Sequence, residues 1–525
     1  MPSQWTLTTQ FASRLREHPD RPVVLGRDHA WSFQQVATRA DALAASFADL
    51  GIERDDRVAV NLPNGVEWLI TALACARLGA TIVPVSPQLN VHELRYQLRH
   101  AEASLVVTIE RFGDVDFLQR FEELLVDLPD LQYVVTVGDE DLWYDDRIFQ
   151  FEDLLSKGQG RSVPAVPVGE DDDLAVIYTS GSAGKPKGVR LSHQALLGNA
   201  VAAARVLELS PDDRVLAPVP FFTVFGFASL LGTITAGAAV IVTPQFHASE
   251  VLRLLESQQA TVLHGVPTMW QLLMREPSFT PARVASLRTG VIAGTDVAEE
   301  LVRRVRGWCD VLVAYGLTET GPTVTITRFS DSDERRVGSV GRALDGVEVM
   351  AVDVVTGVLH GPEAVGEIAV RGPFLMRGYL RMPAETAKVH TPEGFFLTGD
   401  LGIIDEDGYV RIVGRRRDTI ARGGYQVYPR EVEDRLRAHP AVDDVCVIGI
   451  PHDVLGEQVC ACIVPLEGAV ITGRDIILFA KDVMADYKVP DLVRFYDAFP
   501  MSGSGKIRRR ELARSIALDL SAPYS

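Results

Sequence analysis

The sequence predicts an α/β protein: a large N-terminal domain with largely parallel sheets and a β-rich subdomain, followed by a small α+β domain. Strand-like runs alternate with helical periodicity early in the chain, for example at Ser104–Thr108, 117–127 and Gln132–Val137. After about residue 335 the pattern changes to short strands with Gly turns, which indicates the β-rich subdomain. From Arg430 onward, helical and strand patterns alternate again in a compact stretch of domain size.

The N-terminal elements follow from apolar periodicity and turn residues. Arg57–Asn61 and Thr81–Val85 are expected strands, and Trp68–Leu78 between them is expected to be an amphipathic helix. Residues 138–172 are acidic and predict an irregular surface excursion. Later expected helices are Ala195–Leu207, 250–257 and 298–306, and later expected strands are Arg214–Pro218, Ala260–Leu263 and Val311–Ala314.

The segment Val224–Val242 is a candidate transmembrane helix, because it carries no charge over 19 residues. That length reaches the lower limit for a transmembrane helix. The segment contains Gly226, Gly232 and Gly237, which favour a buried helix, a Gly turn and a short strand at Ala239–Val242. We therefore expect no transmembrane segment.

Length and composition limit the classes of function. A chain of 525 residues is too long for one core. The 52 basic and 70 acidic residues give a net charge of −18, which argues against a nucleic-acid partner. The five cysteines form no C-x-x-C pair, and the N-terminus lacks a basic segment followed by an apolar one. We expect reduced packing thiols and a cytoplasmic protein, and a homodimer stays open.

The stretch Ile177–His193 has the composition of a phosphate-binding loop. Small and hydroxyl residues follow a buried strand, and their N–H and O–H groups can converge on a polyphosphate. Lys185 and Lys187 add positive charge, but Pro186 after Gly184-Lys185 excludes a Walker A loop, which needs Ser or Thr there. The loop residues are Thr179, Ser180, Gly181, Ser182, Ala183 and Gly184.

Three further motifs carry groups that suit a nucleotide. In VAYGLTETGP, Tyr315 offers an aromatic face to a purine, Thr318 a hydroxyl to a phosphate, and Glu319 a carboxylate to Mg²⁺. In FFLTGDLG, Asp400 is expected on a tight turn, where it can accept both ribose hydroxyls. In PMSGSGKIRRR, Lys506 follows a Ser/Gly loop. Taken singly, these motifs are common as turns, linkers and basic tails.

Together, the patterns T-S-G-S-x-G-x-P-K-G, Y-G-x-T-E, T-G-D and P-x-S-x-x-G-K occur in order between residues 177 and 506. In this order they resemble the adenylate-forming superfamily of acyl-CoA synthetases, peptide-synthetase adenylation domains and firefly-type luciferases. The resemblance implies ATP, Mg²⁺ and CoA as cofactors and Glu319 as the metal ligand. It implies Lys187, Thr318, Glu319 and Lys506 as catalytic residues. The implied ATP- and AMP-binding residues are Thr179, Ser180, Gly181, Ser182, Gly184, Gly294, Thr295, Tyr315, Gly316, Thr318, Asp400 and Arg415.

The resemblance also implies a domain organisation. Residues 1–415 correspond to the large domain, with the β-rich subdomain at about 335–415, and residues 420–525 correspond to the small domain. The hinge lies at 416–419, where Arg417 replaces the usual Asp or Lys. Gly423 and Gly424 offer bare backbone along which the pantetheine arm of CoA can pass.

The substrate region departs from the family pattern. Thr223 replaces the usual His, and Ile292 and Asp296 are unusual neighbours of the small residues Gly294 and Thr295. No acidic residue is available to pair with an α-amino group, and the Asn of aryl-acid activators is missing. The expected acyl-pocket residues are Phe222, Thr223, Phe225, Phe227, Ala314 and Thr323.

The resemblance therefore predicts an acid–thiol ligase. A hydrophobic fatty or aromatic acid would form acyl-AMP with release of pyrophosphate, and CoA would then give a thioester with release of AMP. One alternative is a ligase that loads an acyl carrier protein. More remote alternatives are an ATPase or kinase that releases ADP, and a binding module without catalysis, which the retained Glu319, Asp400 and Lys506 disfavour.

Overall fold

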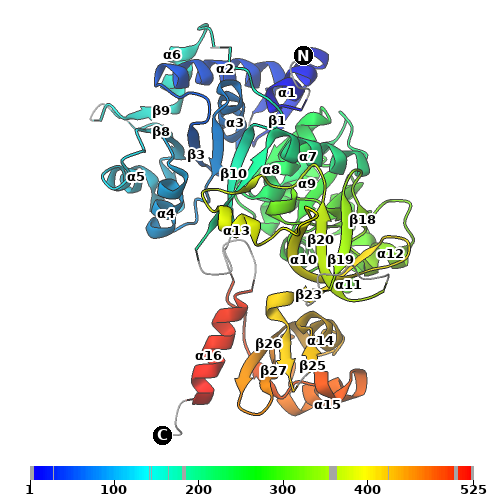
Figure 1. Cartoon of the computed structure of the whole chain (residues 1–525). Coiled ribbons are helices and arrows are strands. Elements are labelled where there is room, and N and C mark those ends of the chain that lie inside the picture. Colours follow the sequence, from blue (N-terminus) through cyan, green and yellow to red (C-terminus); the bar gives the residue numbers. More distant parts are fainter. Residues whose placement is uncertain are drawn as a thin grey trace. The chain divides into compact units, whose positions relative to one another are not determined.

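The computed structural model describes residues 5–27, 29–140, 142, 145–163, 165–179, 185–353, 363–423, 425–501 and 507–521. The chain forms two compact units, coloured along the sequence in Figure 1. The large unit comprises Met1–Glu348 and Val370–Phe396, and the small unit comprises Val349–Ala369 and Leu397–Ser525.

The first sheet of the large unit has eight strands among the described residues, in the order β21-β11-β10-β4-β3-β5-β8-β9. Neighbours from β10 to β9 run parallel, whereas β11 is antiparallel to both β10 and β21. The bounds are β3 (Arg57–Asn61), β4 (Thr81–Pro84), β5 (Leu105–Ile109), β8 (Tyr133–Val137), β9 (Ile148–Gln150), β10 (Asp173–Thr179), β11 (Lys187–Ser192) and β21 (Gly378–Tyr379).

The second sheet has nine strands in the described part of the chain, in the order β18-β17-β16-β15-β14-β12-β13-β1-β2. Strands β16, β15, β14, β12, β13 and β1 run parallel to their neighbours in this order, so the prediction of largely parallel sheets is confirmed. The bounds are β1 (Pro22–Leu25), β2 (Ala30–Ser32), β12 (Arg214–Ala217), β13 (Ala239–Val242), β14 (Val262–Gly265), β15 (Thr289–Ile292), β16 (Leu312–Tyr315), β17 (Thr325–Ile326) and β18 (Arg342–Ala343).

One continuous apolar core joins the two sheets through the helices between them. Trp68 of α3 lies at its centre, with ring centroids 5.6 Å from Phe221 and 4.7 Å from Phe227. The helices of this unit are α1 (Leu7–Glu17), α2 (Phe33–Asp49), α3 (Val66–Leu78), α4 (Val91–Ala101), α5 (Phe117–Leu125), α6 (Phe151–Gly158), α7 (His193–Val206), α8 (Val224–Thr235), α9 (Ala248–Ser257), α10 (Pro267–Arg275), α11 (Glu299–Arg306), α12 (Asp333–Gly338) and α13 (Pro383–Ala387).

Two sequence predictions in this unit are wrong. Helix α3 is not amphipathic, because every residue except Glu67 and Arg77 is buried between other helices and the sheets. Residues 138–172 are not simply an irregular excursion, since they include β9 and α6. Helix α6 packs so closely on α2 that a Cβ on Gly158 would lie 1.9 Å from the Ala42 carbonyl oxygen.

The uncharged segment Val224–Val242 folds as predicted. Helix α8 ends before Gly237, whose φ of +75° allows the turn into β13, and both elements are largely buried. Among the described residues, no helix is both long and apolar enough to cross a membrane.

The small unit contains two sheets. One has the strand order β19-β20-β22-β23, and the other has the order β25-β24-β27-β26 with β28 beside β27. These elements confirm the predicted β-rich stretch and the α+β C-terminal part. The bounds are β19 (Glu348–Val352), β20 (Gly366–Arg371), β22 (Phe396–Ile404), β23 (Val410–Arg415), β24 (Ile420–Arg422), β25 (Tyr425–Val427), β26 (Val442–His452), β27 (Gly456–Pro465), β28 (Leu492–Phe495), α14 (Pro429–Leu436), α15 (Gly473–Val483) and α16 (Arg509–Ser521).

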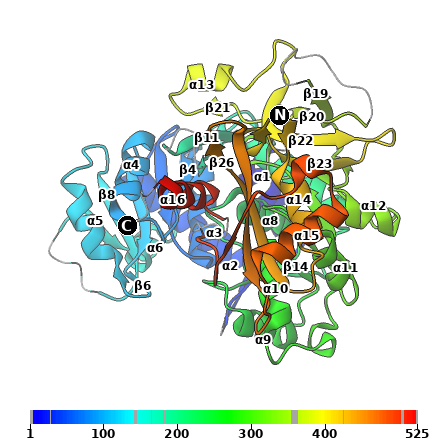
Figure 2. The same cartoon turned by 90° about the horizontal axis from the view of Figure 1, so that it is seen from below.

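Helices cover both faces of the β26–β27 ribbon (Figure 2). Alternate residues face α14 and α15 on one side and α16 on the other, as expected for the two-residue period of a strand. Cys446, Cys460 and Cys462 lie on the α16 side with Leu512 and Ile516. All five cysteines are buried and free, which confirms the prediction of packing thiols.

Candidate active site

The carboxyl ends of β15 and β16 carry four of the predicted nucleotide residues. These strands are parallel neighbours, so the residues that follow them share one edge of the sheet. Gly294 and Thr295 follow β15, Tyr315 ends β16, and Gly316 comes next. Only glycine fits at position 316, because a Cβ would lie 2.3 Å from the Pro322 carbonyl oxygen.

Buried Asn199 of α7 holds the turn after Glu319. Its Nδ2 donates to the Thr323 carbonyl oxygen at 2.6 Å, and its Oδ1 accepts from the Thr323 N–H at 3.1 Å. The Thr320 hydroxyl accepts from the Leu317 N–H at 3.0 Å within the same turn. The predicted residues Thr318 and Thr323 therefore lie on a fixed backbone. Sequence reasoning missed Asn199, which stands in an Ala-rich helix without a local motif.

Strands β10 and β11 form a hairpin, and the predicted phosphate loop lies between them in sequence. Thr179 pairs with Lys187 at its tip, and the loop residues Ser180, Gly181, Ser182, Ala183 and Gly184 lie outside the described residues. The Lys187 ammonium group lies 3.0 Å from Glu385 Oε2 and 4.6 Å from the Tyr379 ring centroid. Hydrogen bonds from Lys388 and Lys187 lower the pKa of Glu385 to about 2, so this carboxylate stays charged.

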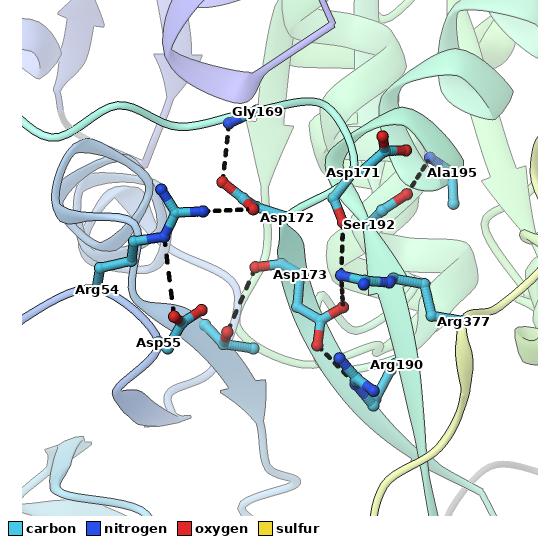
Figure 3. Close-up of polar contacts among 11 residues, drawn as sticks. Arg54, Asp55, Gly169, Asp171, Asp172, Asp173, Arg190, Ser192, Ala195 and Arg377 are labelled. Atoms are coloured by element: carbon cyan, nitrogen blue, oxygen red, sulfur yellow. Dashed lines mark hydrogen bonds and ion pairs between the residues drawn. The ribbon is translucent and has the colours of Figure 1, made fainter.

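Ion pairs anchor the opposite end of the same hairpin (Figure 3). Asp173, which begins β10, accepts from Arg190 Nε of β11 at 2.7 Å and from Arg377 Nη1 at 3.4 Å. Arg377 also donates to the Asp171 carbonyl oxygen at 2.6 Å, and Arg54 pairs with Asp172 at 2.7 Å. Arg377 also donates from its backbone N–H to the Arg190 carbonyl oxygen of β11 at 2.9 Å, so this residue fixes the segment before β21 against both strands of the hairpin.

Strand β21 brings two predicted catalytic residues, Lys187 and Glu319, to one tyrosine. Tyr379 pairs with Val189 of β11, and its hydroxyl donates to Glu319 Oε1 at 3.0 Å. Burial, followed by the negative charge of Glu319, raises the pKa of Tyr379 far above its ordinary value. The phenol therefore stays protonated and can donate. Sequence reasoning missed Tyr379 and Glu385, because only the folded chain places them beside the motifs.

The groups around Glu319 fit a magnesium ion that is held mainly by a nucleotide. In the described part of the chain, no three or more His, Cys, Asp or Glu residues form a metal cage. Mg²⁺ commonly binds through one or two carboxylates together with substrate phosphates and water. A single carboxylate, hydrogen-bonded through one of its oxygens to Tyr379, matches that donor set.

Two of the predicted acyl-pocket residues, Phe225 and Phe227, lie on different faces of α8. Phe225 is half-buried, with its ring centroid 6.2 Å from that of His264, whereas Phe227 is fully buried against Trp68. Residues two positions apart point to opposite sides of a helix, so of these two phenylalanines only Phe225 stays in our proposed pocket. Phe222 is half-buried and Ala314 is buried.

Thr223 caps the N-terminus of α8. Its hydroxyl accepts from the Gly226 N–H at 3.1 Å and donates to the Pro220 carbonyl oxygen at 2.8 Å. The residue that replaces the family's usual His therefore already uses its polar group in the helix cap.

His264 is a neighbour of the acyl-pocket residues that sequence reasoning missed. Burial lowers its pKa to about 4, so the imidazole is neutral at physiological pH. Its Nδ1 atom is buried and has no hydrogen-bond partner among the described residues.

In the small unit, Asp400 and Arg415 face each other across β22 and β23. Their Oδ1 and Nε atoms lie 3.0 Å apart, and Asp400 is 3% exposed. The expected tight turn is wrong, since Asp400 lies within β22. Gly399 has a φ of +72°, and its N–H donates to Glu367 Oε1 at 2.9 Å. Glu367, which the sequence did not indicate, also accepts from Arg416 at 2.9 Å.

The predicted hinge and CoA residues follow β23. Arg417 lies in a short 3₁₀ helix at Arg416–Asp418, where burial and the neighbouring Arg415 lower its pKa. Gly423 has a φ of +57°, and its N–H donates to the Leu455 carbonyl oxygen at 2.8 Å. The predicted residues Gly424 and Lys506 lie outside the described residues.

Comparison with known proteins identifies the family. The family model described as AMP-binding enzyme matches residues 11–380, and the model of the AMP-binding enzyme C-terminal domain matches residues 431–506. The chain belongs to the AMP-binding enzyme family. The predicted superfamily and enzyme class are therefore confirmed: this AMP-binding enzyme is a ligase of the acyl-CoA synthetase type.

Relatives of this AMP-binding enzyme match over nearly its whole length. A feruloyl-CoA synthase of Amycolatopsis sp is 34% identical over 509 residues, covering 95% of this chain and 97% of that protein. A mitochondrial medium-chain acyl-CoA ligase of Bos taurus is 30% identical over 519 residues, covering 93% and 84%. The crystal structure of ATP-bound MatB from Rhodopseudomonas palustris is 31% identical, with a TM-score of 0.87, and covers 97% and 98%. The predicted fold class is confirmed as well.

Proposed function

We propose that this AMP-binding enzyme is an ATP-dependent carboxylic acid:CoA ligase that forms an acyl-AMP intermediate. The observation that carries the proposal is the arrangement of Lys187 and Glu319 around Tyr379, with one positive and one negative group beside the phosphate-loop hairpin. A positive group can bind phosphate oxygens, and a carboxylate can bind the Mg²⁺ ion that accompanies the phosphates.

In the first half-reaction, an oxygen of the substrate carboxylate attacks the α-phosphorus of ATP. The bond from that phosphorus to the bridging oxygen breaks, and pyrophosphate leaves. We assign phosphate binding to the loop Thr179–Gly184, Lys187 and Thr318. Mg²⁺, when bound at Glu319, supplies positive charge to the phosphates. No protein nucleophile is needed, so catalysis depends on positioning and charge stabilisation.

We assign the nucleoside to two sets of residues. Tyr315, Gly316, Gly294 and Thr295, at the carboxyl ends of β15 and β16, would bind adenine. Asp400 would accept hydrogen bonds from the ribose hydroxyls, with Arg415 beside it. Arg415 Nε lies 3.0 Å from Asp400 Oδ1, so the guanidinium keeps this carboxylate beside a positive charge.

In the second half-reaction, the sulfur of CoA attacks the acyl carbonyl carbon. The bond from carbon to the AMP oxygen breaks, AMP leaves, and the thiol proton passes to solvent. We propose that the small domain, 420–525, moves about a hinge at 416–419 centred on Arg417. This movement would exchange Lys506, which assists adenylation, for Gly423-Gly424, along which the pantetheine arm passes.

We propose a hydrophobic acid as the substrate, with Phe222, Thr223, Phe225, Ala314 and Thr323 lining its pocket. The similar proteins act on acids of two kinds: one is named for the feruloyl group and another for medium-chain acyl groups. The deciding experiment is acid-dependent release of pyrophosphate from ATP across aromatic and medium-chain acids. Release with neither kind of acid, or formation of ADP, would contradict the proposal.

The acceptor and the compartment are separate questions. Comparing free CoA with an acyl carrier protein as acceptor of the same acyl-AMP distinguishes the two ligase types. We propose the cytoplasm as the location because all five cysteines are free and buried, although the Bos taurus relative is named as mitochondrial. Cell fractionation tests this location, and light scattering of the purified protein tests for a homodimer.

A further inference from the structure

We infer that Tyr379 is a positioning residue that holds Glu319 for the metal of the bound nucleotide and Lys187 for its phosphates. The inference rests on the proposed function, because it assigns a supporting role at the same site. Tyr379 belongs to none of the motifs that carry the family resemblance. Its role follows from three sets of contacts, each made by a different part of the residue.

The first contact is the hydrogen bond from the Tyr379 hydroxyl to Glu319 Oε1, at 3.0 Å. A glutamate side chain has several rotatable bonds, so a bond to one oxygen restricts the direction in which the other oxygen points. The backbone carbonyl of Glu319 is fixed as well, since it accepts from the Met376 N–H at 2.8 Å. Hydrogen-bond partners of metal-binding carboxylates commonly set the geometry of the metal site.

The second contact is between the Tyr379 ring and the Lys187 ammonium group, which lies 4.6 Å from the ring centroid. Glu385 holds the same ammonium group at 3.0 Å from another direction. The Lys187 side chain is only 13% exposed. A cation held over an aromatic face and beside a carboxylate has lost most of the freedom of its long side chain. The ring face and the hydroxyl of Tyr379 therefore serve different charged groups.

The third set of contacts fixes the backbone around Tyr379. Its N–H donates to the Thr386 hydroxyl at 2.9 Å, and the next N–H, of Leu380, donates to the Gly188 carbonyl oxygen at 2.7 Å. The Tyr379 side chain is consequently placed from β11 on one side and α13 on the other. A residue fixed in this way can transmit a defined position to both of its charged neighbours.

The two roles can be separated by substitution. Tyr379→Phe keeps the ring beneath Lys187 and removes only the hydroxyl, whereas Tyr379→Leu removes both. The analogue α,β-methylene-ATP cannot be cleaved between its α- and β-phosphates. Its binding affinity can therefore be measured without turnover. Affinity is measured by calorimetry, once with EDTA and once with saturating Mg²⁺, and the ratio of the two gives the gain in affinity due to the metal.

We expect Tyr379→Phe to bind the analogue as tightly as the wild type does in EDTA. The factor by which Mg²⁺ increases the affinity should be about tenfold smaller in this variant than in the wild type. Tyr379→Leu should also bind more weakly in EDTA, because Lys187 loses its support. Tyr133→Phe is the matched control: this half-buried tyrosine of β8 lies in the same sheet, away from Lys187 and Glu319, and its substitution should change neither affinity.

A double-variant cycle tests whether Tyr379 acts through Glu319. In a Glu319→Gln background the gain in affinity due to Mg²⁺ is already reduced. Adding Tyr379→Phe to this background should therefore reduce the gain no further. An equal loss in both backgrounds, or a wild-type metal gain in Tyr379→Phe, would overturn the inference. Absence of analogue binding in the wild type would instead contradict the proposed function. The electron paramagnetic resonance spectrum of bound Mn²⁺ gives a second readout, and it should differ between wild type and Tyr379→Phe.

Discussion

Asp400 and Arg415 lie opposite each other on β22 and β23, with Oδ1 and Nε 3.0 Å apart. The pair is held on a strand rather than on a turn, so the carboxylate has a defined direction. A buried, charged acceptor of this kind can distinguish a sugar with two hydroxyls from one that lacks a hydroxyl. This property allows the ribose assignment to be tested directly.

We expect Asp400→Asn to raise the KM for ATP by about 10- to 100-fold, since hydrogen bonds to a charged acceptor contribute roughly 1.5–3 kcal/mol each. The wild type should use 2′-deoxy-ATP poorly, and the variant should treat ATP and 2′-deoxy-ATP almost alike. Acid-dependent pyrophosphate release with both nucleotides measures this. A variant that discriminates as strongly as the wild type would exclude Asp400 from ribose binding.

Glu385→Gln removes the carboxylate that holds Lys187, and we expect acyl-AMP formation to slow by about tenfold because the ammonium group loses its position. Single-turnover pyrophosphate release checks this. Lys388→Ala is the control, since Lys388 contacts the same carboxylate from an exposed position. If both variants slowed the reaction equally, the general charge of the region, rather than the Lys187–Glu385 pair, would be responsible.

Lys506→Ala should separate the half-reactions. We expect acyl-AMP formation to fall by about 100-fold or more, as when one preorganised charged donor is removed. Thioester formation from supplied acyl-AMP should stay near the wild-type rate if, as we propose, the small domain withdraws Lys506 during that step. Both rates are measured by rapid quench. An equal loss in both steps would count against the exchange of positions by the small domain.

Buried histidines should make stability depend on pH below neutrality. Burial lowers the pKa of His193 and of His264 to about 4, from 6.5 in the unfolded chain. Between these values the unfolded state binds more protons, so stability falls as the pH falls from about 6.5 toward 4. Each histidine should cost about 2 kcal/mol between pH 7 and pH 5.

Urea unfolding at both pH values measures this loss. His264→Leu should have a smaller difference between the two pH values than the wild type, since it lacks one titrating group. His193→Gln offers a second comparison, because glutamine can also accept from the Leu7 N–H that His193 Nδ1 binds at 3.1 Å. An unchanged difference in both variants would show that other groups determine the acid sensitivity.

Local sequence patterns predicted the parts of the site that depend on local chemistry. The buried strand β10 follows from the apolar run before the small loop residues, and Gly316 is required by its contact with Pro322. The helix–turn–strand at Val224–Val242 follows from glycine placement. In each case the residues that determine the structure are neighbours in sequence.

Long-range contacts explain what the sequence did not predict. Asn199 meets Thr323, and Tyr379 meets Glu319, across 124 and 60 positions of the chain. Neither residue carries a local pattern that distinguishes it from a packing residue. The misjudged helix α3 has the same cause, since residues far away in sequence, such as Phe221 and Phe227, help to bury all of it except Glu67 and Arg77.

The accessibility of the cysteines beneath α16 depends on whether this C-terminal helix is packed against the β26–β27 ribbon. Cys446, Cys460 and Cys462 share one apolar layer with Leu512 and Ile516, and every thiol in it is sealed from solvent. Any event that lifts this helix must expose sulfur atoms to an alkylating reagent. The rate of cysteine labelling therefore reports how often α16, which follows Lys506, separates from the β26–β27 ribbon, and no added probe is needed.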